Sequence, residues 1–89
     1  MASLDKIKET IRGIAGRRKN TTFDEIGWIM NQLKQFYDVD SRKTRHGVLF
    51  RVGNRRFAVC THNPGSGQVK PAYVDEFIDA MTDLGLYDD

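Results

Sequence analysis

Residues 48–61 read VLFRVGNRRFAVCT, and this stretch decides the fold expected for the chain. Positions 48, 50 and 52 are apolar and share one face of a strand, and positions 57, 59 and 61 share one face of the next. Between them, Gly53-Asn54 is typical of a two-residue hairpin turn, because both residues tolerate positive φ. We therefore predict a β-hairpin over about 48–61. Its outward face would be basic and only partly apolar, with Leu49, Arg51, Arg56, Ala58 and Cys60.

Two amphipathic helices are predicted before the hairpin. The first spans Leu4–Ala15, with Ser3 as N-cap, apolar residues at intervals of three and four, and Gly16 at its end. The second begins with a capping box, in which Thr22 and Glu25 exchange side-chain and backbone hydrogen bonds. Its apolar stripe continues to Tyr37.

A third helix is predicted after the hairpin, from Pro71, which suits a first helical turn. Gly85 stands where a Schellman motif needs a left-handed residue, with Leu86 as its apolar partner. Residues 68–70 are interpreted as a very short third strand. The sequence thus predicts an α+β fold, in which a small antiparallel sheet of three strands packs against helices.

The length of 89 residues allows one domain, spanning 1–89. No apolar run approaches the roughly 18 residues of a membrane span, and the N-terminus does not resemble a secretory signal. The single cysteine excludes an internal disulfide. We therefore expect a cytoplasmic protein that does not contact a membrane.

Charge is segregated along the chain. Residues 41–74 contain seven Lys and Arg and no carboxylate, whereas residues 75–89 contain six carboxylates and no base. A stretch of this kind is suited to binding phosphate, either as a nucleic-acid surface or, without a ligand, as a solvated basic face. The candidate RNA-binding residues are Arg42, Lys43, Arg45, Arg51, Arg55, Arg56 and Lys70.

His46 is the strongest candidate for catalysis, because a histidine can act as general acid or base near neutral pH. In RNA the 2′-hydroxyl is a built-in nucleophile, so a histidine surrounded by cations can cleave the strand without a metal ion. His62, at the end of the hairpin, is a possible auxiliary residue. The two histidines and Cys60 lack the spacing of zinc motifs, so we expect no metal site and no cofactor.

From Thr22 onward the chain resembles the HicA-type (YcfA-like) mRNA interferase toxins. FDEIGWIMNQLKQFY is similar to the family's first helix, and Lys43-Thr44-Arg45-His46 stands where the family has a basic residue and Gly-Ser-His. A strand ending in Val59-Cys60-Thr61-His62 and the segment 68–74 complete the likeness, as does Leu84-Gly85-Leu86 near the C-terminus. The resemblance covers residues 21–87 and leaves 1–20 as an N-terminal helical extension.

The resemblance implies a fold like the double-stranded-RNA-binding domain, catalysis by His46, and two partners, mRNA and a HicB-type antitoxin. Thr44-Arg45 departs from Gly-Ser, and residues 46–50 are one residue longer than the family pattern. A β-bulge at Gly47 would absorb that residue. The alternatives are a catalytically inactive RNA-binding module and a protein-interaction domain that uses the helix faces. The resemblance does not assign a role to residues 1–20. Their basic connector could extend the RNA-binding surface or be solvated.

Overall fold

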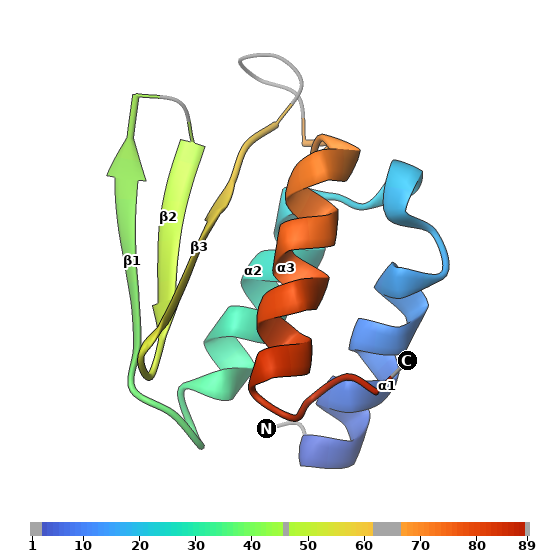
Figure 1. Cartoon of the computed structure of the whole chain (residues 1–89), viewed down its shortest axis with the longest axis vertical. Coiled ribbons are helices and arrows are strands. Elements are labelled where there is room, and N and C mark those ends of the chain that lie inside the picture. The colour runs from blue at the N-terminus through green and yellow to red at the C-terminus, as the bar shows by residue number, and fades with distance from the viewer. Residues whose placement is uncertain (1–2, 46, 62–66, 89) are drawn as a thin grey trace.

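The computed structural model describes residues 3–45, 47–61 and 67–88. In chain order the elements are α1 (Leu4–Ala15), the 3₁₀ helix η1 (Arg18–Asn20), α2 (Phe23–Leu33), β1 (Val39–Thr44), β2 (Gly47–Val52), β3 (Arg55–Val59) and α3 (Pro71–Asp83). The strands form one antiparallel sheet in the order β1-β2-β3. The helices all lie on one side of this sheet, and α1 is the one farthest from it (Figure 1). The predicted α+β class is confirmed.

The core lies between the sheet and the helices. Rings from four elements form a continuous series from Phe23 through Phe50 and Phe57 to Phe77, with centroids 6.1, 5.7 and 5.7 Å apart. This series joins α2, β2, β3 and α3 into one core, because each ring packs against the next one in the series.

Local signals fix the ends of the helices. Ser3 accepts a hydrogen bond from the Lys6 backbone N–H, and the capping box of Thr22 and Glu25 is formed as predicted. At the end of α3 the N–H of Leu86 donates to the Met81 carbonyl, which completes the predicted Schellman motif. The helix α2 ends at Leu33 instead of Tyr37, because the chain turns over residues 34–36.

The third strand is not where the sequence analysis placed it. It is β1, whereas Gln68 and Val69 make only single antiparallel bridges, to Thr22 and Thr61. The strand β1 contains one apolar residue, Val39, because it lies at the sheet edge, where helices cover little of it. It therefore lacks the alternation that reveals a half-buried strand.

The predicted hairpin is confirmed, with two differences in detail. Gly53 has a φ of +59°, whereas among the described residues other than glycine none has a positive φ, so Asn54 does not use that freedom. The pairing of β1 with β2 runs without a bulge from Val39↔Val52 to Thr44↔Gly47, so the bulge expected at Gly47 does not form.

Candidate nucleic-acid interface

One end of the molecule gathers the segments that the sequence analysis singled out. The end of β1, the start of β2, the end of β3 and the start of α3 all lie there (Figure 1). Gly47 packs so closely on the end of β3 that a Cβ built on it would lie 2.4 Å from the Val59 carbonyl oxygen and 2.8 Å from Cys60 Sγ. The Cys60 carbonyl accepts a hydrogen bond of 3.1 Å from the Lys70 N–H. Gly47 and Lys70 are thus held on either side of Cys60.

Cys60 is buried, and is not part of the outward face of the sheet where the sequence analysis placed it. A hydrogen bond between the Cys60 side chain and the Tyr73 hydroxyl raises the pKa of Tyr73 above its ordinary value. Tyr73, in the first turn of α3, was not among the predicted site residues. No sequence signal distinguishes it, because its neighbour Cys60 lies on a different element.

Four of the predicted RNA-binding residues belong to this end of the molecule. Arg42 and Lys43 lie in the second half of β1, Arg45 follows that strand, and Lys70 is the N-cap of α3. All four side chains are exposed. Within residues 3–45, 47–61 and 67–88, none of the four has a carboxylate partner. We call Arg42, Lys43, Arg45 and Lys70 the basic end.

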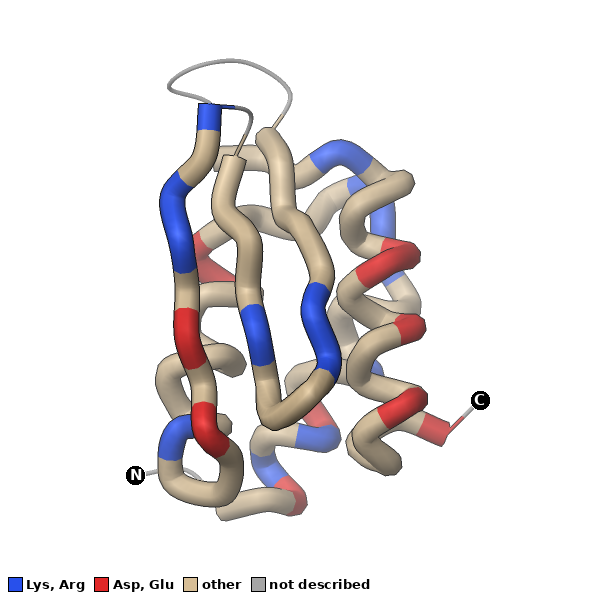
Figure 2. The backbone as a smooth tube through the Cα atoms, turned by 60° about the vertical axis from the view of Figure 1, so that its left-hand side comes forward, with Lys and Arg blue, Asp and Glu red and all other residues tan. Residues whose placement is uncertain are grey.

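The other three predicted residues lie toward the opposite end of the sheet, near the β2–β3 turn, and two of them are paired with carboxylates. Arg51 forms ion pairs with both Asp38 and Asp40. The hydrogen bond with Asp40 contributes most, and that with Asp38 next, to raising the pKa of the Arg51 guanidinium. Asp40 lies in β1 and Asp38 just before it, and Figure 2 shows the red segment of β1 beside the blue segment of β2.

Arg55 and Arg56 differ in their surroundings. The Nε of Arg55 donates to Asp83 at the end of α3, 2.9 Å away. Arg56 is exposed and lies directly opposite Arg51 in the strand pairing. The fold therefore brings acids from other parts of the chain onto the segment that has none of its own.

The basic connector that follows α1 has a structural role. Arg17 pairs with Glu25 of α2, and Arg18 pairs with Asp75 of α3 at 2.7 Å. The bond from Arg17, followed by those within the capping box, holds the pKa of Glu25 below its ordinary value. These two arginines therefore join the connector to α2 and α3. Lys19 is the one cation of the connector that is exposed and has no carboxylate partner in the part of the chain described.

The roles predicted for His46 and His62 fall on residues outside the described ones. Their described sequence neighbours are Arg45 and Gly47 for the first, and Thr61, which bridges to Val69, for the second. Among the described residues, no group of three or more His, Cys, Asp and Glu side chains is arranged to hold a metal ion. None of the described helices is both long and apolar enough to cross a membrane.

The succession α2-β1-β2-β3-α3, with the helices on one side of an antiparallel sheet, is a fold like the double-stranded-RNA-binding domain, to which α1 is added. In comparisons with known proteins, no family model, curated protein or solved structure matches the chain. The resemblance to the HicA-type toxins therefore stays a prediction.

Proposed function

We propose that this protein binds RNA through the basic end and cleaves it as a metal-independent endoribonuclease, in the manner of a HicA-type toxin. One observation carries the proposal. One end of the molecule gathers four cations from two distant parts of the sequence, and none of them has a carboxylate partner among the described residues. They are Arg42, Lys43 and Arg45 from β1 and the residue after it, and Lys70 from the start of α3. Such a surface suits the phosphates of an A-form helix, which domains of this fold recognise by shape and charge.

In the proposed reaction His46 removes the proton of a 2′-hydroxyl, and the oxygen attacks the adjacent phosphate. The P–O5′ bond breaks as the P–O2′ bond forms, and the products are a 2′,3′-cyclic phosphate and a 5′-hydroxyl. His46, as general acid, returns the proton to the leaving 5′-oxygen. The cations of the basic end stabilise the negative charge that develops on the phosphorane. Arg45 is the nearest of them in sequence, and Lys70 would act from the start of α3.

The same proposal includes a HicB-type antitoxin as partner and mRNA in the cytoplasm as substrate. An acidic surface on the antitoxin would complement the basic end and would associate with it at a rate that falls with added salt.

A catalytically inactive RNA-binding module is the second candidate. The observation that favours it is Thr44-Arg45, which replaces the Gly-Ser that precedes the catalytic histidine in the family pattern. Such a module would bind RNA with the same salt dependence and leave it intact.

The test is RNA cleavage by the purified protein in excess EDTA, with His46→Ala alongside and with RNA binding measured for both. The proposal expects cleavage by the wild type alone and binding by both proteins. Binding by both without cleavage would establish the inactive module instead. Cleavage by both would overturn the role of His46, and the absence of binding at low salt would overturn both candidates.

A further inference from the structure

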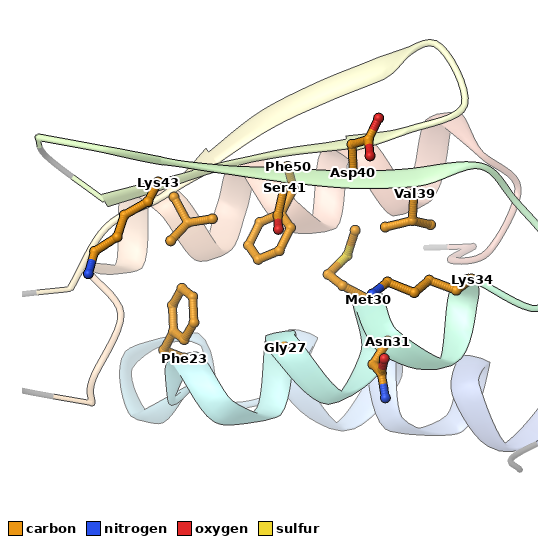
Figure 3. Close-up of a pocket in the computed structure, with 11 residues that line it drawn as sticks. Phe23, Gly27, Met30, Asn31, Lys34, Val39, Asp40, Ser41, Lys43 and Phe50 are labelled. Atoms are coloured by element: carbon orange, nitrogen blue, oxygen red, sulfur yellow. The ribbon is translucent and has the colours of Figure 1, made fainter.

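The sheet has an open edge with an unfilled groove beside it. Between β1 and α2 lies a groove of about 500 Å³, seen in Figure 3 with the lining side chains. Its lining is apolar toward the core and carries Lys34 and Lys43 at its sides. Gly27 widens it, because a Cβ there would have nothing within 4 Å. The apolar lining residues are Phe23, Met30, Val39, Val48 and Phe50.

The hydrogen bonding of β1 shows which of its backbone groups face outward. The Gly53 N–H donates to the Asp38 carbonyl at 2.8 Å, and these two residues continue the pairing that ends at Val39↔Val52. In an antiparallel ladder, bonded pairs alternate with non-bonded pairs. Residues 40, 42 and 44 therefore bond to β2, whereas residues 39, 41 and 43 turn their N–H and C=O groups away from the sheet.

These outward groups are available for another strand. Among the described residues, β2 is the only segment to which β1 makes backbone hydrogen bonds, and the outward backbone groups of β1 bond to none. An edge strand with free backbone groups is a template for pairing with a further strand.

We propose that β1 pairs antiparallel with β1 of a second copy of this chain, with the twofold axis at Ser41. The backbone requires residues 39, 41 and 43 of one copy to bond to residues 43, 41 and 39 of the other. In this register Asp40 lies directly opposite Arg42 of the second copy, and symmetry forms this ion pair twice. Opposite charges in such cross-strand positions stabilise a sheet.

Charge also selects this register among those that the backbone allows. Centring the pair on residue 40 would place Asp40 opposite Asp40, and centring it on residue 42 would place Arg42 opposite Arg42. The other edge of the sheet offers no such match, because β3 has the sequence RRFAV and contains no carboxylate. The β1 edge is thus complementary to itself, and the β3 edge is not.

Residues 39, 41 and 43 direct their side chains to the groove side of the sheet. The grooves of the two copies would face each other across the axis. Pairing two strands of six residues buries less surface area than a standard protein–protein interface, which buries about 1,600 Å². We therefore expect a reversible dimer with a dissociation constant in the micromolar range, up to a few hundred micromolar.

Disulfide trapping tests the register directly. The variant Ser41→Cys places two thiols opposite each other with Cα atoms about 5.5 Å apart, within the range that a disulfide spans. Thr44→Cys is the matched control on the same exposed strand, and it lies about 20 Å from its counterpart. In mild oxidant we expect covalent dimers of Ser41→Cys only, since the native Cys60 is buried. A monomeric Ser41→Cys, or equal cross-linking of Thr44→Cys, would overturn the proposal.

A charge exchange, followed by sedimentation equilibrium without RNA, tests the ion pairs. Asp40→Lys and Arg42→Glu should each raise the dissociation constant about tenfold, because each replaces two attractions with two repulsions. The double variant should return it close to the wild-type value. Asp40 also contacts Arg51, so the recovery in the double variant is the result that separates a cross-strand pair from a local disturbance. A wild type that stays monomeric at millimolar concentration, or a double variant as weak as either single one, would contradict the dimer.

Discussion

At the scale of single residues, Gly47 shows how a position can be required for a reason that local sequence does not reveal. Its φ is +153°, and its Cα faces the Val59 carbonyl and the Cys60 side chain. The glycine lets β2 begin directly against the end of β3, where the basic end is built. A glycine next to a suspected catalytic residue suggests a bulge, but here it is needed for a close approach between strands.

Gly47→Ala should therefore destabilise the protein by about 2–4 kcal/mol, since it adds both backbone strain and a clash with backbone atoms. Urea unfolding measures the change. Gly13→Ala, in the last turn of α1 with nothing within 4 Å of the added Cβ, should stabilise the fold by about 0.5 kcal/mol. Equal effects of the two substitutions would contradict the packing described for Gly47.

Glu25 gives a pH-dependent contribution at the same scale. Its pKa is lower in the folded chain than the ordinary value of 4.5, chiefly because Arg17 bonds the carboxylate. The ionised form is thus favoured by folding, so the contribution is full above about pH 4.5 and is lost as the pH falls through the lower folded pKa.

Glu25→Gln keeps an amide that can serve the capping box but removes the charge. We expect it to lower the free energy of unfolding by about 0.5–1 kcal/mol at pH 7 and by much less at pH 2–3. Urea titrations at the two pH values measure the difference, with Glu9→Gln on the exposed face of α1 as the control. A gap that persists unchanged in acid would show that the pairing with Arg17 is not its source.

At the scale of elements, α1 is part of the core, although the family resemblance sets it apart as an extension. Ile7, Ile11 and Ile14 are fully buried against α2 and α3. The connector behind it is fixed by Arg17 and Arg18 to the same two helices. The helix therefore covers the side of α2 and α3 that faces away from the sheet (Figure 1).

Ile11→Ala should cost about 2–5 kcal/mol, as for other buried large-to-small substitutions. That is a large part of the stability of a domain of this size. Thermal unfolding followed by circular dichroism measures it, with the exposed Glu9→Ala as the control. An unchanged melting temperature for Ile11→Ala would mean that α1 is a dispensable extension.

At the scale of the whole molecule, the fold redistributes charge that the sequence arranges in blocks. Acids of residues 38–40 and Asp83 pair with Arg51 and Arg55, so part of the acid-free segment becomes electrostatically mixed. Figure 2 shows basic segments toward one end of β1 and acidic segments toward the other. Of the cations in residues 41–74, those of the basic end and Arg56 have no carboxylate partner among the described residues.

This distribution predicts unequal effects on RNA binding. Arg45→Ala and Lys70→Ala should each weaken binding and reduce the slope of log K against log salt by about 0.7–0.9, the loss of one phosphate contact. Arg55→Ala should change the slope little, because its guanidinium is already paired with Asp83. Fluorescence anisotropy with a short RNA duplex at several salt concentrations measures all three. An effect of Arg55→Ala as large as that of Arg45→Ala would extend the interface to the end of the sheet that carries the β2–β3 turn.

The helices, the hairpin and the α+β class could be predicted from the sequence, because caps, turns and apolar periodicity act over a few neighbouring residues. It missed β1, whose edge position removes the alternation that marks a strand, and it placed the third strand at residues 68–70 instead. The seven cations of residues 41–74 are equivalent in the sequence, whereas in the fold Arg51 and Arg55 pair with carboxylates from outside that segment. The folded chain alone shows which cations are neutralised, that α1 packs against α2 and α3, and that Gly47, Cys60 and Lys70 lie together. These properties depend on contacts between elements, and the sequence of one element does not show which other element it contacts.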